Sequence, residues 1–480
     1  MLAAAAVIGV IAALGVVADE NIGGAGGTAG GVIVTDDAGA MQINSSNPLT
    51  QPVFLNGQDV LSVIKAQASI NAEQASINAE QAGINEELRQ LNANQSREIS
   101  SLKQDVCRLQ VPKLGWIPGA GSEGRKWAGG VLAPNGLVYG VPYSATSVLI
   151  INPATSTLNT TTISGLPSGE YKWHSGVLAP NNNIIYCFPS NDNSVLKFDP
   201  STNTADWTTI TGVGSSTFKF RGGVLAPNNN IIYCLPFVHD SVLKIDPATN
   251  TADWTTMSSV GTEQYGIHGG VLANNGLIYG IPNSGTFVLI IDPVTDTVDT
   301  TTLDGLSTQK SKWQAGTVVP DGRIFCVPRA ADAVLVIDTE TNTLDITSIA
   351  GLGSDRFKWS AGVLATNGLI YGVPLSASAV LIVDPAAMTA DTTSITVPAA
   401  GLDWLGGMLT ANGKVLGIPY ASNSVLVIDP DTNTADTTSL AHVGFSNGKY
   451  RGGVLGPNGQ VYAIPNYAES VLVINVGCCW

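Results

Sequence analysis

The sequence is poor in charged residues, in cysteine and in histidine. Charged residues make up only 12% of its 480 residues, and it contains six cysteines and four histidines. Six cysteines are too few for a disulfide scaffold in a chain of this length, and no CxxC motif is paired with a second one or with spaced histidines. The histidines are scattered, without the spacing of a nucleophile–base pair, at His174, His239, His268 and His442. We therefore expect a protein that is not an enzyme, with no catalytic residues, no cofactor and no metal.

The chain also lacks a surplus of positive charge. Its formal net charge is −15, whereas nucleic-acid binding requires a surface rich in lysine and arginine that neutralises phosphates. We therefore expect no nucleic-acid partner.

Residues 1–18 lack charged side chains altogether. A cleaved signal peptide fits their length and the small residue Ala18, although the basic segment that opens such peptides is missing. A membrane anchor fits their apolarity, although a stretch this short only just crosses a bilayer. Both interpretations stay open, and both argue against a cytosolic enzyme. Residues 19–57 are expected to form a glycine-rich linker followed by an extended attachment segment.

Most of the chain is an internal repeat with a spacing of 45 to 47 residues. Self-similarity at this period is typical of a β-propeller or a solenoid. Each copy contains a glycine followed by Val-Leu, with Thr or Met in place of the Val in two copies. These anchor glycines are Gly130, Gly176, Gly223, Gly270, Gly316, Gly362, Gly407 and Gly453.

Each repeat predicts four short strands, as a propeller blade requires. In the first copy they are residues 127–133 (strand A), 137–141 (strand B), 147–151 (strand C) and 159–163 (strand D). The Asn-Gly pair between strands A and B is a favoured two-residue hairpin turn.

Strands A, B and C occur eight times, but strand D follows strand C only seven times. The missing copy lies at the front, because Ile117 stands thirteen residues before Gly130, as Ile163 stands before Gly176. Residues 113–480 number 368, which is eight repeats of 46 residues. We therefore predict an all-β, eight-bladed β-propeller over this range, with an N-terminal strand that completes the last blade and closes the ring.

Strand C and the turn after it resemble a known repeat. The stretch Val425–Thr434, with its Asp-Pro-x-Thr-Asn-Thr turn, is similar to the repeat of YVTN-type β-propellers. The resemblance implies the propeller fold and no particular chemistry.

Residues 58–110 follow a different, seven-residue period. Ile70, Ile77, Ile84 and Leu91 lie seven residues apart, a spacing typical of an α-helical coiled coil. Isoleucine-rich core positions favour a coiled coil of three or more helices over one of two helices. We therefore predict a homotrimeric coiled-coil stalk, and a single amphipathic helix packed on the propeller is the alternative.

The segment Asn47–Leu61, NPLTQPVFLNGQDVL, leads into this stalk. It resembles the PL-x-VNG-x-DVL stalk segment in surface fibre proteins of large DNA viruses of algae and protists, which also runs into a coiled coil. The resemblance implies a fibre attached to a virion, with the N-terminal arm bound to its capsid or membrane.

Three cysteines lie near the point where the predicted ring closes. Cys107 precedes the closing strand, and Cys478 and Cys479 follow the last strand C. We predict a disulfide between Cys107 and one of the vicinal pair, and an interchain bond through Cys107 in a trimer is the alternative. The other three cysteines fall in strand B and are expected to be inert packing residues.

Positive charge gathers in the segments between a strand D and the next strand A. These segments contain eleven of the seventeen lysines and arginines of the propeller, and they share one face of the disc with the B–C loops, where binding groups concentrate. We predict a ring of positive charge around one mouth of the central channel. In the first alternative, the lysines only make the protein soluble, and their aliphatic stems lie along the tryptophans. In the second, the lysines form ion pairs with aspartates of neighbouring blades. The predicted ligand-binding residues are Lys126, Lys172, His174, Lys219, Arg221, His268, Lys312, Gln314, Lys358, Lys449 and Arg451, with Arg125, Lys310 and Arg356 close by.

These features together predict a surface fibre or adhesion protein. The head would bind a host or partner surface, either an anionic glycan or a protein, and the stalk would trimerise and attach to a virion. The expected location is a virion surface or the outside of a cell. The alternatives are a secreted or surface adhesin of a cell, a structural capsid decoration protein, and a carbohydrate-active enzyme that uses the region of His174 and His268.

Overall fold

The computed structural model divides the chain into two compact units, residues 1–102 and 103–480. It describes the side chains of residues 62–102, 112–261, 266–398 and 401–477, and outside these ranges only the backbone of four short strands and of the two ends of one helix. Within the described residues, no helix has both the length and the apolarity that a membrane crossing requires. The apolar segment 1–18 lies outside the described residues, so its role stays a prediction.

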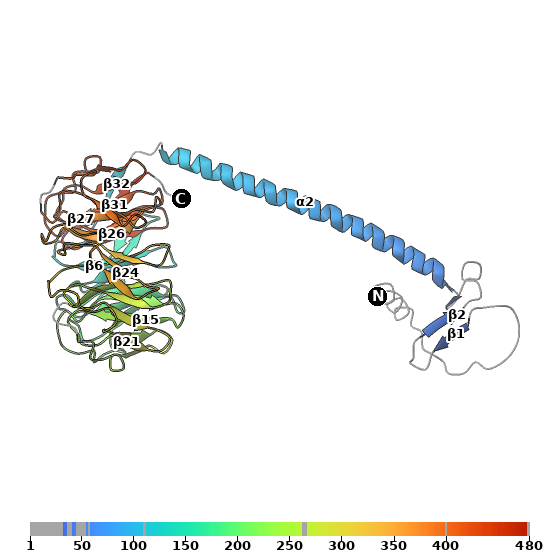
Figure 1. Ribbon diagram of the computed structural model, residues 1–480, viewed down its shortest axis with the longest axis horizontal. Helices are drawn as coiled ribbons and strands as arrows, with labels where there is room; N and C mark the ends of the chain where they lie inside the picture. Colours follow the sequence, from blue (N-terminus) through green and yellow to red (C-terminus); the bar gives the residue numbers. More distant parts are fainter. Residues whose placement is uncertain are drawn as a thin grey trace. The chain divides into compact units, whose positions relative to one another are not determined.

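The described residues of the N-terminal part of the chain form two pairs of short strands and one long helix (Figure 1). Strand β1 (Val32–Thr35) pairs with β2 (Met41–Asn44), and β3 (Phe54–Leu55) pairs with β4 (Gln58–Asp59). Helix α2 (Val60–Arg108) is continuous over 49 residues.

Helix α2 carries a stripe of exposed apolar side chains. Contiguous apolar surface of this kind marks a contact region on soluble proteins. The predicted helix is confirmed, whereas the coiled coil and the trimer remain predictions, because both concern contacts with other copies of the chain. The side chains of the stripe, each between 50% and 58% exposed, are Ile70, Ile77, Ile84, Leu88, Leu91, Ile99 and Leu102.

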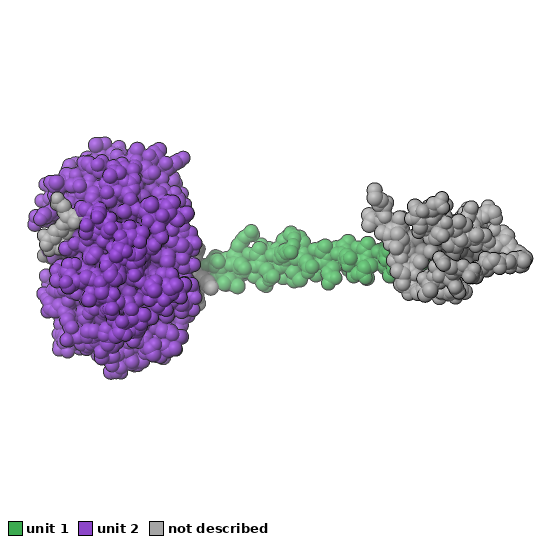
Figure 2. Space-filling model, turned by 90° about the horizontal axis from the view of Figure 1, so that it is seen from below, with its two compact units in different colours: residues 1–102 green, residues 103–480 purple. Residues whose placement is uncertain are grey.

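The second unit is an eight-bladed, all-β propeller of four-stranded antiparallel sheets, as the repeat predicts (Figure 1; purple in Figure 2). Blades 1 to 7 each contain four consecutive strands, paired in the order A, B, C, D. Their strands are β6 (Trp127–Leu132), β7 (Val138–Pro142), β8 (Leu149–Asn152) and β9 (Thr157–Asn159) in blade 1; β10 (Trp173–Ala179), β11 (Ile184–Pro189), β12 (Leu196–Asp199) and β13 (Thr204–Asp206) in blade 2; β14 (Phe220–Ala226), β15 (Ile231–Pro236), β16 (Leu243–Asp246) and β17 (Thr251–Asp253) in blade 3; β18 (Ile267–Leu272), β19 (Ile278–Pro282), β20 (Leu289–Asp292) and β21 (Thr297–Asp299) in blade 4; β22 (Thr317–Val318), β23 (Ile324–Cys326), β24 (Leu335–Asp338) and β25 (Thr343–Asp345) in blade 5; β26 (Trp359–Leu364), β27 (Ile370–Pro374), β28 (Leu381–Asp384) and β29 (Thr389–Asp391) in blade 6; and β30 (Trp404–Leu409), β31 (Val415–Pro419), β32 (Leu426–Asp429) and β33 (Thr434–Asp436) in blade 7.

Blade 8 joins the two ends of the propeller. Its strands A, B and C are β34 (Tyr450–Leu455), β35 (Val461–Pro465) and β36 (Ser470–Asn475), and its strand D is β5 (Lys113–Pro118) from the front of the propeller. Strands β36 and β5 pair along their whole length. The predicted closure is confirmed, and β5 covers the edge of β36, which would otherwise be an unpaired edge of the kind that templates aggregation.

The predicted disulfide cannot be placed on this closure, because the side chain of Cys107 and the residues Cys478 and Cys479 lie outside the described residues. The three cysteines of the B strands are free and buried. Burial raises the pKa of each of their thiols well above the usual value, which keeps them protonated and unreactive. They are Cys187, Cys234 and Cys326.

The residues that recur in the blades also build the blades. In five blades a buried tryptophan stands three residues before the anchor glycine, and its Nε1 donates a hydrogen bond of 2.8–2.9 Å to a backbone carbonyl just before strand C. The aspartates that end strand C accept backbone hydrogen bonds, as Asp199 does from the N–H of Ser201 at 2.7 Å, which is how Asp stabilises a turn. Both sets are therefore structural.

Candidate functional site

One position of the repeat turns toward the central channel in every blade. It lies two residues before the anchor glycine and follows the buried aromatic or apolar position. In seven blades it lies at a bulge in the pairing of strands A and B, and a bulge changes the direction in which a side chain points. The preceding side chain therefore packs inside the blade, while this one faces the channel. The eight channel-facing residues are Ala128, His174, Arg221, His268, Gln314, Ser360, Leu405 and Arg451.

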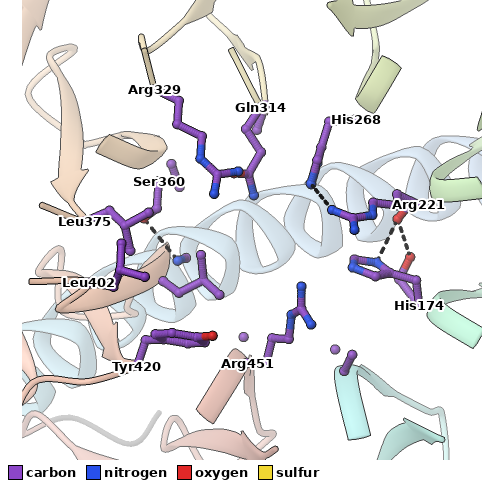
Figure 3. Close-up of a pocket in the computed structure, with 18 residues that line it drawn as sticks. His174, Arg221, His268, Gln314, Arg329, Ser360, Leu375, Leu402, Tyr420 and Arg451 are labelled. Carbon is purple, nitrogen blue, oxygen red and sulfur yellow. Dashed lines mark hydrogen bonds between the residues drawn. The ribbon is translucent and has the colours of Figure 1, made fainter. Parts of the chain in front are cut away.

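These residues line a cavity of about 390 Å³, a volume within the usual range for small-ligand sites. The cavity has a polar side and an apolar side (Figure 3). Arg221 and His268 lie on the polar side, opposite Leu375 and Leu402. A ligand held here meets charged donors on one flank and hydrocarbon on the other.

Three arginines converge on this cavity, Arg221, Arg329 and Arg451. The guanidinium carbon of Arg221 lies 3.9 Å from the ring centroid of Phe237, and that of Arg451 lies 5.1 Å from the ring centroid of Tyr143. Because a planar guanidinium stacks on an aromatic face, these rings support the arginines and hold them beside the channel.

The positive charge of the cavity is not balanced by acidic residues, since none of its described lining residues is Asp or Glu. Burial lowers the pKa of Arg329 to about 10, with the charge of Arg451 as the second cause. The Nη1 of Arg329 donates a hydrogen bond of 2.6 Å to Oε1 of Gln314, whereas its Nε is buried without a hydrogen-bond partner. At neutral pH the arginines stay charged and create a positive potential in a confined space, which attracts anions.

Two histidines lie beside the arginines, and both are neutral at neutral pH. Burial, followed by the charges of Arg451 and Arg221, lowers the pKa of His174 well below its usual value, and burial followed by Arg221 does the same for His268. Nδ1 of His174 lies 3.0 Å from the carbonyl oxygen of Arg221, so this nitrogen carries the proton and donates it. Its Nε2 is then an acceptor, and it is buried without a hydrogen-bond partner. The cavity therefore offers several charged donors and one bare acceptor.

Metal binding does not suit this arrangement. In the part of the chain that the structure describes, no three His, Cys, Asp or Glu side chains lie close enough together to hold an ion. His174 and His268 share their cavity with arginines, whose charge opposes the binding of a cation. The chemistry of the cavity therefore favours an anion.

A second cavity, of about 410 Å³, adjoins the channel among the D–A loops that lead into blades 3, 5 and 6 and the B–C loops of blades 3, 4 and 5. We call it the rim pocket. It shares Arg221, His268 and Arg329 with the channel. The residues that line only the rim pocket are Phe218, Phe237, Asn283, Ser284, Lys310, Ser311 and Arg356.

The eleven residues predicted from the sequence divide into two groups. The structure brings five of them together at the channel, where their binding of a ligand stays a prediction: His174, Arg221, His268, Gln314 and Arg451. The other six, which are lysines, do not line either cavity. They are Lys126, Lys172, Lys219, Lys312, Lys358 and Lys449.

The structure corrects the expectation that these lysines surround the mouth of the channel. They are at most 5% exposed, and their ammonium groups bind backbone carbonyls of the surrounding loops. Nζ of Lys219, in blade 3, lies 3.2, 2.8 and 3.0 Å from the carbonyl oxygens of Ser190, Asp192 and Ser216. Burial lowers the pKa of Lys219 to about 8. Since Ser190 and Asp192 belong to blade 2, the lysine connects neighbouring blades.

Replacement of Lys312 by Met is expected to lower the free energy of unfolding by about 2–4 kcal/mol. Nζ of Lys312 donates to the carbonyl oxygens of Gly285 and Gln309 at 2.8 and 3.0 Å, and a buried carbonyl that loses its donor costs about 1–3 kcal/mol. Lys310→Met in the same loop removes an exposed lysine and is expected to change stability by less than about 0.5 kcal/mol. Urea unfolding measures both, and equal values would show that the buried lysine is not structural.

The sequence-based prediction missed a second set of channel residues. Arg329, Leu375 and Tyr420 line the channel, and each follows the proline that ends a strand B. The residue after this proline differs from blade to blade, whereas the proline recurs in all eight. Variation at that position, inside an otherwise constant repeat, is the signal that would have identified them.

The sequence has little similarity to that of known proteins. No family model matches the sequence, and no curated protein matches it. Among solved structures, a streptogramin B lyase is 11% identical, with a TM-score of 0.48 over 76% of this chain and 98% of that chain. A virginiamycin B lyase from Staphylococcus aureus is 10% identical, with a TM-score of 0.47 over 76% of this chain and 99% of that chain. Hydrazine synthase of Kuenenia stuttgartiensis is 12% identical, with a TM-score of 0.43 over 66% of this chain and 97% of that chain.

Proposed function

We propose that the propeller head binds an anionic glycan on a host or partner surface through the mouth of its central channel. The observation that supports this most is the group of Arg221, Arg329 and Arg451 around one cavity whose described lining contains no carboxylate. Guanidinium groups bind carboxylates and other oxyanions through paired, charge-assisted hydrogen bonds.

Two further features favour a sugar over a simple inorganic anion. Nε2 of His174 is a buried acceptor without a hydrogen-bond partner, and a sugar hydroxyl is a donor that fits it. Leu375 and Leu402 form the opposite, apolar side of the cavity, which suits the C–H face of a sugar ring. An anion without hydroxyl and C–H groups would use only the arginines.

We further propose that α2 joins three chains into a homotrimeric stalk and that the N-terminal arm attaches the stalk to the capsid or membrane of a virion. The exposed apolar stripe of α2 supports the first part, and the resemblance of Asn47–Leu61 to viral stalk segments supports the second. Three heads on one stalk bind a surface that carries many copies of a glycan far more tightly than one head does. On this proposal the protein is a non-enzymatic attachment fibre at the virion surface.

An adhesin of a cell and a capsid decoration protein are the other assignments compatible with the same architecture. Imaging with an antibody against the head distinguishes them, since label on the particle supports a fibre or decoration protein and label on a cell supports an adhesin.

The glycan-binding proposal predicts a specific loss when Arg451 is replaced by Gln. Arg451 lines only the channel, and a hydrogen bond to a charged group contributes about 1.5–3 kcal/mol. On an array of sialylated, sulfated and neutral glycans, the unaltered protein is expected to bind charged glycans selectively. Arg451→Gln is expected to weaken this binding at least about tenfold.

The matched control is Lys113→Gln, which removes the same charge from an exposed residue of β5 outside both cavities. It is expected to bind as the unaltered protein does. The absence of charged-glycan binding, or equal binding by Arg451→Gln, would contradict the proposal. Mass spectrometry of the bound glycans tests the remaining alternative, because cleavage products would assign a carbohydrate-active enzyme.

A further inference from the structure

We infer that the rim pocket is a second anion subsite, so that the head recognises two anionic groups carried by one ligand, and that the ligand is a sulfated oligosaccharide. This inference rests on the proposed function and specifies the class of glycan that the site selects.

The rim pocket is lined mainly by donors. Four cationic side chains line it, those of Arg221, Lys310, Arg329 and Arg356, and no Asp or Glu is among its described lining residues. Asn283, Ser284 and Ser311 contribute amide and hydroxyl groups. A sulfate, with oxygens that only accept hydrogen bonds, matches such a lining.

Two cations of the rim pocket are not balanced by a carboxylate of the described residues. Within the described ranges neither Lys310 nor Arg356 forms an ion pair, although the chain has a net charge of −15. Among the described residues, five cations on other parts of the propeller have an acidic partner within 2.5–3.3 Å, in the pairs Arg125–Glu170, Lys197–Asp206, Lys244–Asp296, Arg323–Asp321 and Lys414–Asp429. The six buried lysines instead bind backbone carbonyls. Lys310 and Arg356, which line one cavity without forming an ion pair within the described ranges, are suited to an anion from outside the chain.

The two cavities share a wall, and this makes them two parts of one site. Arg221 and Arg329 line both cavities, Arg451 lines only the channel, and Lys310 and Arg356 line only the rim pocket. An anion in either cavity therefore has cations of its own and cations in common with its neighbour. The shared arginines lie between the two bound anions and reduce their mutual repulsion.

The linings of the two cavities also differ in a way that favours sulfate in the rim pocket. The leucines that form the apolar side of the channel, Leu375, Leu402 and Leu405, are absent from the described lining of the rim pocket. The rings of Phe218 and Phe237 lie 5.6 and 3.9 Å from the guanidinium carbon of Arg221, which they support from the side. The rim pocket therefore offers mainly polar and charged contacts, which suit a sulfate, while the channel also offers an apolar side for the C–H face of a sugar.

A glycan with a single carboxylate, such as one that ends in sialic acid, fills only one of these subsites. A sulfated oligosaccharide carries anionic groups on successive sugars and fills both. The two probes for a test are accordingly a heparin-derived tetrasaccharide, with several sulfates, and 3′-sialyllactose, with one carboxylate. Their affinities for the full-length protein are measured by isothermal titration calorimetry.

The variant that isolates the rim pocket is Lys310→Gln with Arg356→Gln. It is expected to bind the tetrasaccharide at least about tenfold more weakly than the unaltered protein, because it loses two charged donors, and to bind 3′-sialyllactose within about twofold of the unaltered value. The control is Arg89→Gln with Lys113→Gln, which removes two charges from exposed positions outside both cavities and is expected to leave both affinities unchanged.

Two results would overturn the inference alone: equal affinity of the unaltered protein for the two probes, or an equal loss for both probes in the Lys310→Gln, Arg356→Gln variant. The first would show that one subsite accounts for all binding, and the second that these residues act only through the general charge of the head. Failure of the unaltered protein to bind either probe would overturn the proposed function together with the inference.

Discussion

A protein that carries Ile77→Asp and Ile84→Asp is expected to sediment as a single chain, whereas the unaltered protein is expected to sediment as a trimer. Ile77 and Ile84 are 53% and 51% exposed on the isolated helix, and in the proposed trimer they are buried against two copies of themselves. The two substitutions place three carboxylates in each of two core layers. An unpaired buried charge costs several kcal/mol, so this change is expected to abolish assembly at micromolar concentration.

The control for this experiment is Ala72→Asp with Ala79→Asp, on the side of the helix opposite the apolar stripe. These substitutions add the same charges and lower the helix propensity more than the two isoleucine substitutions do. The protein that carries them is nevertheless expected to remain a trimer. Sedimentation velocity gives the number of chains in each case. An unaltered protein that sediments as a monomer would contradict the trimer, and so would a trimer that tolerates Ile77→Asp and Ile84→Asp.

Loss of the side chain of Ile117 is expected to weaken the closure of the ring. Ile117 lies on β5, is 4% exposed, and packs in a cluster that includes Trp127 and Leu149 of blade 1 and Ile464 of blade 8. Replacement of a buried isoleucine by alanine costs about 2–5 kcal/mol. We expect a loss of this size in the free energy of unfolding, measured by urea titration followed by tryptophan fluorescence.

Two companion substitutions define what this loss means. Ile163→Ala removes the same side chain from the equivalent place in blade 1, where it is 3% exposed, and is expected to cost about as much. Trp116→Ala changes the neighbouring residue of β5, which is 48% exposed, and is expected to cost less than about 1 kcal/mol. If Ile117→Ala were as mild as Trp116→Ala, β5 would not be an ordinary fourth strand of blade 8.

The two assembly predictions bear on the function in different ways. The channel is lined by residues from all eight blades, so an opened ring loses the arrangement of Arg221, Arg329 and Arg451. Loss of the trimer acts differently, since it leaves each head intact and changes only how many heads bind one surface at the same time. Binding measured on single heads in solution should therefore survive Ile77→Asp with Ile84→Asp, whereas attachment to a glycan-coated surface should weaken.

The fold was largely predictable because a propeller is a local structure repeated. Each blade contacts mainly its neighbours, so the strand pattern of one copy, counted along the chain, predicts the whole ring. The offset of Ile117 from Gly130, equal to that of Ile163 from Gly176, also identifies the closing strand from the sequence alone. The helix was predictable for the same reason, since a seven-residue period is a local property of the sequence.

The candidate site was predictable only in part, and the lysines show why. In the sequence, Lys172 and His174 stand two residues apart in the same segment. Nothing in the local sequence shows that the side chain of Lys172 is buried between blades whereas that of His174 lines the channel. The structure buries Lys172, with its Nζ 3.0 Å from the carbonyl oxygen of Ala145. That carbonyl belongs to the preceding blade, so the burial of the lysine depends on how two blades pack.

The sequence by itself determined the propeller, its eight blades, the closing strand and the long helix, because each of these follows from a period or an offset along the chain. Only the tertiary structure decided which charged residues meet. Arg329 follows a strand B of blade 5 and Arg451 stands in a strand A of blade 8, yet closure of the ring brings both to one channel. The physical reason is that the charge of a site depends on which side chains share a cavity, and in a ring those come from distant parts of the sequence.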